Sequence, residues 1–151
     1  MLRLRGGSAL STFRLEKLTN TIQTEFPQVS HIYAEYWHFC ALTRDLQQHE
    51  LTILQQLLTY GPAQESMDPT GELLLVLPRP GTISPWSTKA TDISHHCGLA
   101  VVERIERGIA YMIQTTEKFT VETKEPLQAL LHDRMTEAIF ESFDDAEQLF
   151  Q

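Results

Sequence analysis

The longest uninterrupted aliphatic run in this chain covers only residues 73–77, so its apolar side chains are divided among many short segments. A helix that spans a bilayer needs about 20 apolar residues, so no transmembrane segment is expected. A short run of this kind is typical of a central β-strand that is buried on both faces. With 151 residues, the chain has the length of one domain and can bury a core of its own.

The charge and the cysteines restrict the classes of partner. The chain carries 12 Lys and Arg against 20 Asp and Glu, a formal net charge of −8. Because nucleic-acid binding needs a basic surface, we expect no nucleic-acid partner, and without a span we expect no membrane partner. Cys40 and Cys97 are too few for a secreted domain that depends on disulfides. Reduced thiols and the lack of an apolar leader predict a cytoplasmic protein.

Strand and helix patterns alternate along the chain, and residues that begin or break segments separate them. The expected segments are a strand at 1–5, a helix ending near 25, a strand at 29–39, a helix ending near 60, a strand at 73–77, a helix ending at 98, strands at 99–105 and 109–114, a helix from 126 and a short turn at 144–150. The expected helix starts are Ser8 or Ser11, Thr43 or Asp45, Ser87 or Thr88, and Pro126. The expected breaks are Gly6-Gly7, Gly61-Pro62, Gly98 and a hairpin at Arg107-Gly108.

This order predicts an α+β fold with a mostly antiparallel sheet and helices packed on one face. The last two strands are joined by a short hairpin in this interpretation, which favours antiparallel pairing. Acidic and basic residues alternate around that hairpin, from Glu103 to Arg107, and are expected to be a solvated strand pair.

The segment from residue 78 to residue 92 carries the most chemical information. Three prolines and one glycine restrict its backbone, and it then enters a helix whose first N–H groups attract anions. Such a loop can contact a phosphate or a carboxylate. The alternative is a proline-stiffened connector with Trp86 packed on the sheet. The candidate site residues are Arg79, Thr82, Ser84, Trp86, Ser87, Lys89, Thr91 and Asp92.

Metal and nucleophile patterns are weak. Adjacent His95, His96 and Cys97 would point about 100° apart on a helix, so they cannot converge on one ion. His38 and Cys40 share one face of a strand but lack a second ligand pair. Neither cysteine lies in a nucleophile elbow, so we predict no catalytic residue and no metal site in this chain.

Several motifs, of which Pro78 to Ile93 is the longest, are similar to those of a known protein family. The motifs are Arg5-Gly6, Ala9-Leu10-Ser11, Phe13-Arg14, Ile32 to Tyr36, Tyr60-Gly61-Pro62, Pro78 to Ile93, Arg104 to Gly108, His132 to Glu137, and Asp144 to Glu147. In this order they resemble the N-terminal domain of large, single-chain phosphoribosylformylglycinamidine synthase, over essentially the whole chain.

The resemblance implies a function that composition does not reveal. That family is an ATP-dependent ligase and glutamine amidotransferase of purine biosynthesis, which makes formylglycinamidine ribonucleotide from formylglycinamide ribonucleotide, ATP and glutamine. Its N-terminal domain is similar to a fused pair of the small accessory subunits of the split enzyme. The glutaminase triad and the binding sites for ATP and Mg²⁺ belong to later domains of the family.

The resemblance therefore implies that residues 1–151 are a single accessory domain of a much longer enzyme, with a linker starting near 141–151. Alone, it is expected to be inactive and to hold no cofactor. Its implied partners are the synthetase and glutaminase domains of the same chain, and residues 78–92 are expected near the substrate cleft. The alternative is a standalone interaction module that bridges separate glutaminase and synthetase subunits.

Overall fold

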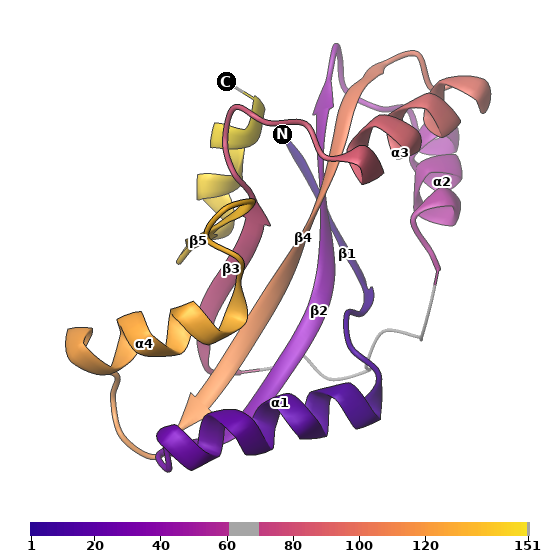
Figure 1. Ribbon diagram of the computed structural model, residues 1–151. Coiled ribbons are helices and arrows are strands. Elements are labelled where there is room, and N and C mark those ends of the chain that lie inside the picture. Colours follow the sequence, from indigo (N-terminus) through magenta and orange to yellow (C-terminus); the bar gives the residue numbers. More distant parts are fainter. Residues whose placement is uncertain (61–69, 151) are drawn as a thin grey trace.

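The computed structural model describes residues 1–60 and 70–150. A five-stranded sheet forms its centre, in the order β1-β2-β4-β3-β5, and all neighbouring strands pair antiparallel (Figure 1). The strands are β1 (Leu2–Ser8), β2 (Val29–Leu42), β3 (Glu72–Pro78), β4 (Val102–Thr115) and β5 (Glu137–Phe140). The α+β fold with a mostly antiparallel sheet is confirmed.

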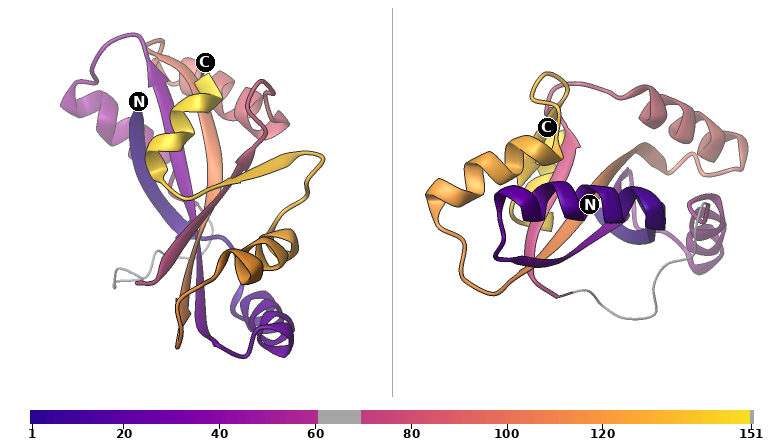
Figure 2. Two further views of the ribbon diagram at one scale, coloured as in Figure 1. Left: turned by 90° about the vertical axis from the view of Figure 1, so that its left-hand side faces the viewer. Right: turned by 60° about the horizontal axis from the view of Figure 1, so that its bottom comes forward.

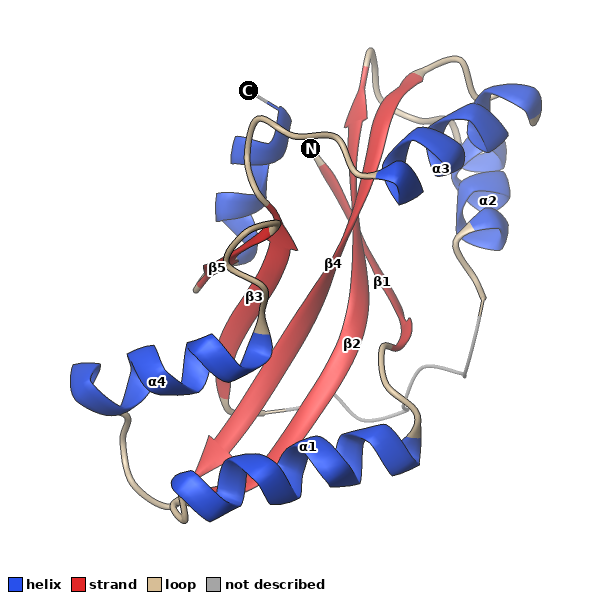
Figure 3. Cartoon of the chain, in the orientation of Figure 1, coloured by secondary structure: helices blue, strands red, loops and turns tan. Residues whose placement is uncertain are grey.

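Helices connect the strands and cover the sheet (Figure 3). They are α1 (Thr12–Glu25), α2 (Gln48–Leu57), α3 (Pro85–His96), α4 (Val121–Leu131) and a 3-10 helix, η1 (Phe143–Phe150). α1 and α4 lie at one end of the long strands and α2 and α3 at the other (Figures 1 and 2). No helix in the described residues is long and apolar enough to cross a membrane.

The side-chain alternation along β2 separates the two faces of the sheet. Ala34 packs with α1 and α4, and Cys40, on the same face, packs with α2 and α3. Phe39 points to the opposite face and packs with η1. The predicted central strand behaves as expected, since Leu74 and Leu75 are fully buried on opposite faces of β3.

Two glycine positions predicted as breaks lie inside strands. β1 continues through Gly6 to Ser8 with an irregular register, and a Cβ on Gly6 would lie 2.7 Å from Cε1 of His38. β4 likewise runs straight through Gly108, which pairs with Trp37, so the predicted hairpin is wrong. A Cβ on Gly108 would lie 2.9 Å from the Val76 carbonyl oxygen. Both glycines thus permit close approach between neighbouring chain segments, and neither forms a turn.

The helix predicted from Pro126 is also wrong in its bounds. Thr120 caps α4, so Pro126 lies inside a helix that has already begun, and the helix ends at Leu131. Residues of the expected helix instead form β5, which pairs with β3 from Glu137 to Phe140. This pairing covers the edge of β3, which would otherwise expose unpaired backbone groups.

Of the remaining helices, α1 has the cap that the sequence predicted, whereas α2 and α3 have different ones. Ser11 caps α1 as predicted, and its hydroxyl accepts from the Arg14 N–H at 3.2 Å. Gln47 caps α2 instead, and its N–H donates to the Glu50 carboxylate at 2.9 Å. Arg44 also donates to this carboxylate. Ser84 caps α3, which ends as expected before Gly98, whose φ is +86°. The predicted break at Gly61-Pro62 lies outside the described residues.

Candidate functional site

Residues 79–84 form a connection from β3 to α3, and Ser84 fixes its end. The Ser84 hydroxyl accepts from the Ser87 N–H at 3.0 Å, and Pro85 occupies the first helical position. Proline suits this position because its missing N–H would have no helical partner there. The same hydroxyl donates to Oε1 of Glu106 on β4, at 2.8 Å. α3 is therefore attached to β4 at its first turn.

Two further hydroxyls of the candidate set attach α3 to the open edge of β4. Before Ile109, no described strand pairs with this edge. Ser87 is fully buried and donates to the Ile105 carbonyl at 2.5 Å, and Thr91 accepts from the Ile105 N–H at 3.1 Å. These side chains replace the missing strand, so Ser84, Ser87 and Thr91 position the helix instead of facing solvent.

The other polar members of the candidate set are exposed: Arg79, Thr82, Lys89 and Asp92. The Arg79 guanidinium donates to the Arg134 carbonyl at 3.1 Å, and the Thr82 hydroxyl donates to the Arg79 carbonyl at 2.6 Å. Asp92 lies beyond the first turn of α3, because the helix begins earlier than predicted. It therefore has no place at the positive end of the helix dipole.

Trp86, the last member of the set, lies against the sheet as the alternative interpretation held. Its ring stacks on His38 with centroids 5.8 Å apart. The Arg107 guanidinium carbon lies 4.7 Å from the centre of the Trp86 ring and 4.2 Å from that of Tyr36. A third ring, Tyr60, lies 5.8 Å away and its hydroxyl accepts from Arg107 at 3.2 Å. Three aromatic rings thus surround one cation, a favourable arrangement for the ring quadrupoles.

His38 completes this cluster as a neutral group. Its Nε2 lies 2.6 Å from the Tyr60 hydroxyl. Burial, together with the nearby Arg107 charge, lowers the pKa of His38 to about 4, against a smaller opposing effect of the Leu4 backbone. Burial also raises the pKa of Tyr60, although Arg107 opposes this. At neutral pH the cluster therefore contains a protonated phenol, a neutral imidazole and one positive charge, on Arg107.

The sequence predicted that the charged side chains from Glu103 to Arg107 face solvent. This prediction is wrong for Glu106. Its carboxylate is fully buried and bonded to Arg104 as well as to Ser84. Arg104 also donates to the Thr82 carbonyl at 2.7 Å and to the Leu149 carbonyl at 2.5 Å. This network connects the loop before α3 to η1.

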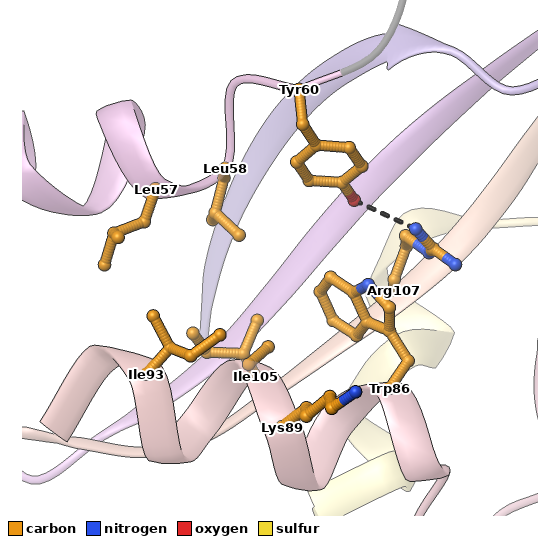
Figure 4. Close-up of a pocket in the computed structure, with 9 residues that line it drawn as sticks. Leu57, Leu58, Tyr60, Trp86, Lys89, Ile93, Ile105 and Arg107 are labelled. Atoms are coloured by element: carbon orange, nitrogen blue, oxygen red, sulfur yellow. Dashed lines mark hydrogen bonds between the residues drawn. The ribbon is translucent and has the colours of Figure 1, made fainter. Parts of the chain in front are cut away.

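Two cavities flank the Trp86–Arg107 pair. The first, of about 300 Å³, lies between α2 and α3 and is mostly apolar (Figure 4). The second, of about 200 Å³, is lined by Tyr36, Ser84 and Glu137 among others. A cation between aromatic walls beside an apolar cavity is suited to binding an anionic group that carries an apolar body.

Sequence reasoning selected Trp86 and Lys89 but missed Tyr36, Tyr60 and Arg107. All three lie in motifs that carry the resemblance, and this was the available signal. Among the described residues, no three His, Cys, Asp or Glu side chains gather as metal ligands would. Cys40 is fully buried, and burial raises the pKa of its thiol to about 12, far from the thiolate that nucleophilic or metal chemistry needs.

The chain matches a known protein family over most of its length. Residues 35–150 match the family model described as formylglycinamide ribonucleotide amidotransferase N-terminal. The match covers the aromatic cluster, the loop before α3 and η1, and it confirms the resemblance found in the motifs.

Proposed function

Since this chain belongs to the formylglycinamide ribonucleotide amidotransferase N-terminal family, we propose that it is the N-terminal accessory domain of a phosphoribosylformylglycinamidine synthase. In that enzyme, formylglycinamide ribonucleotide, ATP and glutamine give formylglycinamidine ribonucleotide during purine biosynthesis. We propose that the domain is inactive alone, that ATP and Mg²⁺ bind to the synthetase domain, and that glutamine is hydrolysed in the glutaminase domain, all in a cytoplasmic enzyme.

One observation supports a contact role most strongly: two neighbouring loops expose apolar side chains. The Arg79 N–H donates to the Thr136 carbonyl at 3.1 Å, which brings residues 79–84 beside residues 132–136. On these loops Ile83 is 64% exposed and Met135 is 83% exposed. Large apolar side chains that are exposed on neighbouring loops are typical of surfaces that a partner covers.

We propose that this surface, formed by residues 79–84 and 132–136, faces the synthetase domain near its substrate cleft. Some of its hydroxyl and carbonyl groups are hydrogen-bonded within the fold. The shape of the surface is therefore fixed before contact, and little conformational entropy is lost on docking. Arg79 adds a cation that suits a phosphate-bearing substrate or an acidic partner segment. In this role the domain organises the catalytic domains and does not react itself.

The experiment uses the full-length enzyme that contains this domain. Ile83→Ser with Arg79→Ala is expected to lower the rate of formylglycinamidine ribonucleotide synthesis at least tenfold, because both changes remove contacts of the proposed surface. Lys17→Ala, an exposed cation on α1, is the matched control and should leave the rate unchanged. Equal rates in both variants would contradict the contact role.

Activity of the separate chain tests the remaining part of the proposal. Purified residues 1–151 should release no ammonia from glutamine and should not hydrolyse ATP, and measurable turnover would contradict an accessory role. The second candidate function is a standalone module that bridges separate subunits. Capture of separate synthetase and glutaminase chains by residues 1–151, lost in the Ile83→Ser variant, would favour that alternative.

A further inference from the structure

The cavity between α2 and α3 has three walls of different origin (Figure 4). α2 and the residues after it supply Leu57, Leu58 and Tyr60, α3 supplies Trp86, Lys89, Ala90 and Ile93, and β4 supplies Ile105 and Arg107. Its volume of about 300 Å³ lies at the small end of the range of ligand pockets, which favours a small molecule over a helix or strand of another protein.

The two cations that line this cavity lack acidic partners. Among the described residues, no carboxylate lies within 4.0 Å of the side-chain nitrogens of Arg107 or Lys89. Among the described residues, some other cations have carboxylate partners, namely Arg3, Arg5, Arg44, Arg104 and Lys124, whereas Arg14, Lys17, Arg79, Lys118 and Arg134 have none within this distance. The positive charge at the cavity is therefore available to an external anion.

The Arg107 guanidinium is held in place for such an anion. Tyr36 and Trp86 lie close to it, with ring centres 4.2 and 4.7 Å from its central carbon, and Tyr60 accepts one of its N–H groups. In the described part of the chain its other N–H groups have no hydrogen-bond partner. A planar guanidinium with free N–H groups matches the two oxygens of a carboxylate, and pre-positioning reduces the entropy lost on binding.

We propose that this cavity, the Arg107 pocket, binds a small organic carboxylate whose apolar body, an aryl or branched alkyl group, lies between Leu57 and Ile93. The carboxylate pairs with Arg107 and is approached by Lys89. The mostly apolar lining favours a singly charged acid over a phosphate dianion, whose second charge would be buried among apolar side chains. The inference does not depend on the proposed contact surface, since the pocket lies between α2 and α3.

The test follows the backbone and Trp86 indole N–H signals of the ¹⁵N-labelled 151-residue chain by NMR during titration. The probe is phenylacetate, and the matched neutral compound is phenylacetamide. Phenylacetate is expected to give saturable shifts at Trp86 and Lys89, with at least tenfold tighter binding than the amide. Equal binding of acid and amide, no saturable shift, or tighter binding of phenyl phosphate would overturn the proposal.

Variants separate the pocket from general charge effects. Arg107→Met, which retains an unbranched side chain without charge, should weaken phenylacetate binding at least tenfold. Ala90→Leu fills the cavity and leaves both cations in place, so it should also abolish binding even if Arg107→Met fails to fold. Lys17→Met, which removes an exposed cation of α1 outside the pocket, should bind as the unchanged chain does. Unaltered binding by Ala90→Leu would place the ligand elsewhere and refute the assignment.

Discussion

Two pairs of helices cover the same face of the long strands β2 and β4, and they pack in different ways. At the closed end, under α1 and α4, an apolar core contains Ile22, Ile32 and Leu127. At the open end, under α2 and α3, the core around Leu54 continues into His38, Arg107 and a cavity. The two ends share strands and side-chain alternation but differ in polarity.

This difference indicates that the polar residues of the open end have a role besides stabilising the fold. Burying a histidine and enclosing an arginine without a carboxylate costs free energy that apolar side chains of similar size would avoid. The closed end shows that this sheet can pack a mostly apolar core against two helices. The polar groups of the open end are therefore explained better by binding than by folding.

The largest expected effect compares packing at the two ends. Ile22→Ala, at a fully buried site of the closed end, should lower the free energy of unfolding by about 2–5 kcal/mol, since it leaves a cavity. Ile93→Ala, at a side chain that lines the Arg107 pocket and is 49% exposed, should change it by about 0.5 kcal/mol or less. Urea unfolding followed by circular dichroism measures both. Similar losses would show that the open end is packed as tightly as the closed end.

Sequence patterns predicted the regular parts of the closed end well. The cap at Ser11, the buried strand at residues 73–77 and the antiparallel sheet were confirmed because each depends on local spacing or turn chemistry. The errors at Gly6 and Gly108 have one physical cause. A glycine that makes a turn and one that permits close approach look alike in sequence, and only the neighbouring strand distinguishes them.

The site was predictable only in part. Trp86 and Lys89 were selected because they follow a proline-rich loop, but Arg107 was predicted to be solvated since its sequence neighbours are charged. Its actual neighbours, Tyr36 and Tyr60, are brought to it by strand pairing and by the position of α2. Contacts between residues so far apart leave no local pattern. β5 was missed for the same reason, because its pairing depends on the edge of β3.

The second prediction concerns the buried charges beside the open end. Glu106→Gln removes the negative partner of Arg104 and should cost about 3 kcal/mol of stability, because it leaves a largely buried cation without its counter-ion. Glu103→Gln, at an exposed position of the same strand, should change stability by about 0.5 kcal/mol or less. Chemical unfolding at pH 7 compares them. A loss in Glu106→Gln no greater than that in the control would mean that the pair is not needed for folding.

The third prediction uses pH to distinguish the ends. The unfolded chain binds a proton at His38 near pH 6.5, whereas the folded chain resists it down to a pKa of about 4. Stability should therefore fall as the pH is lowered from 7 to 5, by about 2 kcal/mol from this group, and the loss is complete below pH 4. His38→Gln should reduce this slope. The measurement is the urea midpoint at pH 7, 6 and 5, and an unaltered slope in the variant would contradict a neutral, buried His38.

The smallest expected effect compares the two serine caps. Ser11→Ala removes one exposed hydrogen bond to Arg14 and should cost about 0.5–1 kcal/mol. Ser84→Ala also removes a cap, but it additionally takes a donor from buried Glu106, so the cost should reach about 2 kcal/mol.

A double-mutant cycle isolates the second contribution. If Ser84 acts partly through Glu106, Ser84→Ala should cost about 1 kcal/mol less in the Glu106→Gln background, whereas Ser11→Ala should cost the same in both. Unfolding free energies of the single and double variants give these differences. Additive losses for Ser84 and Glu106 would mean that Ser84 acts only as a helix cap. The two ends would then differ in their aromatic cluster but not in how their helices are attached.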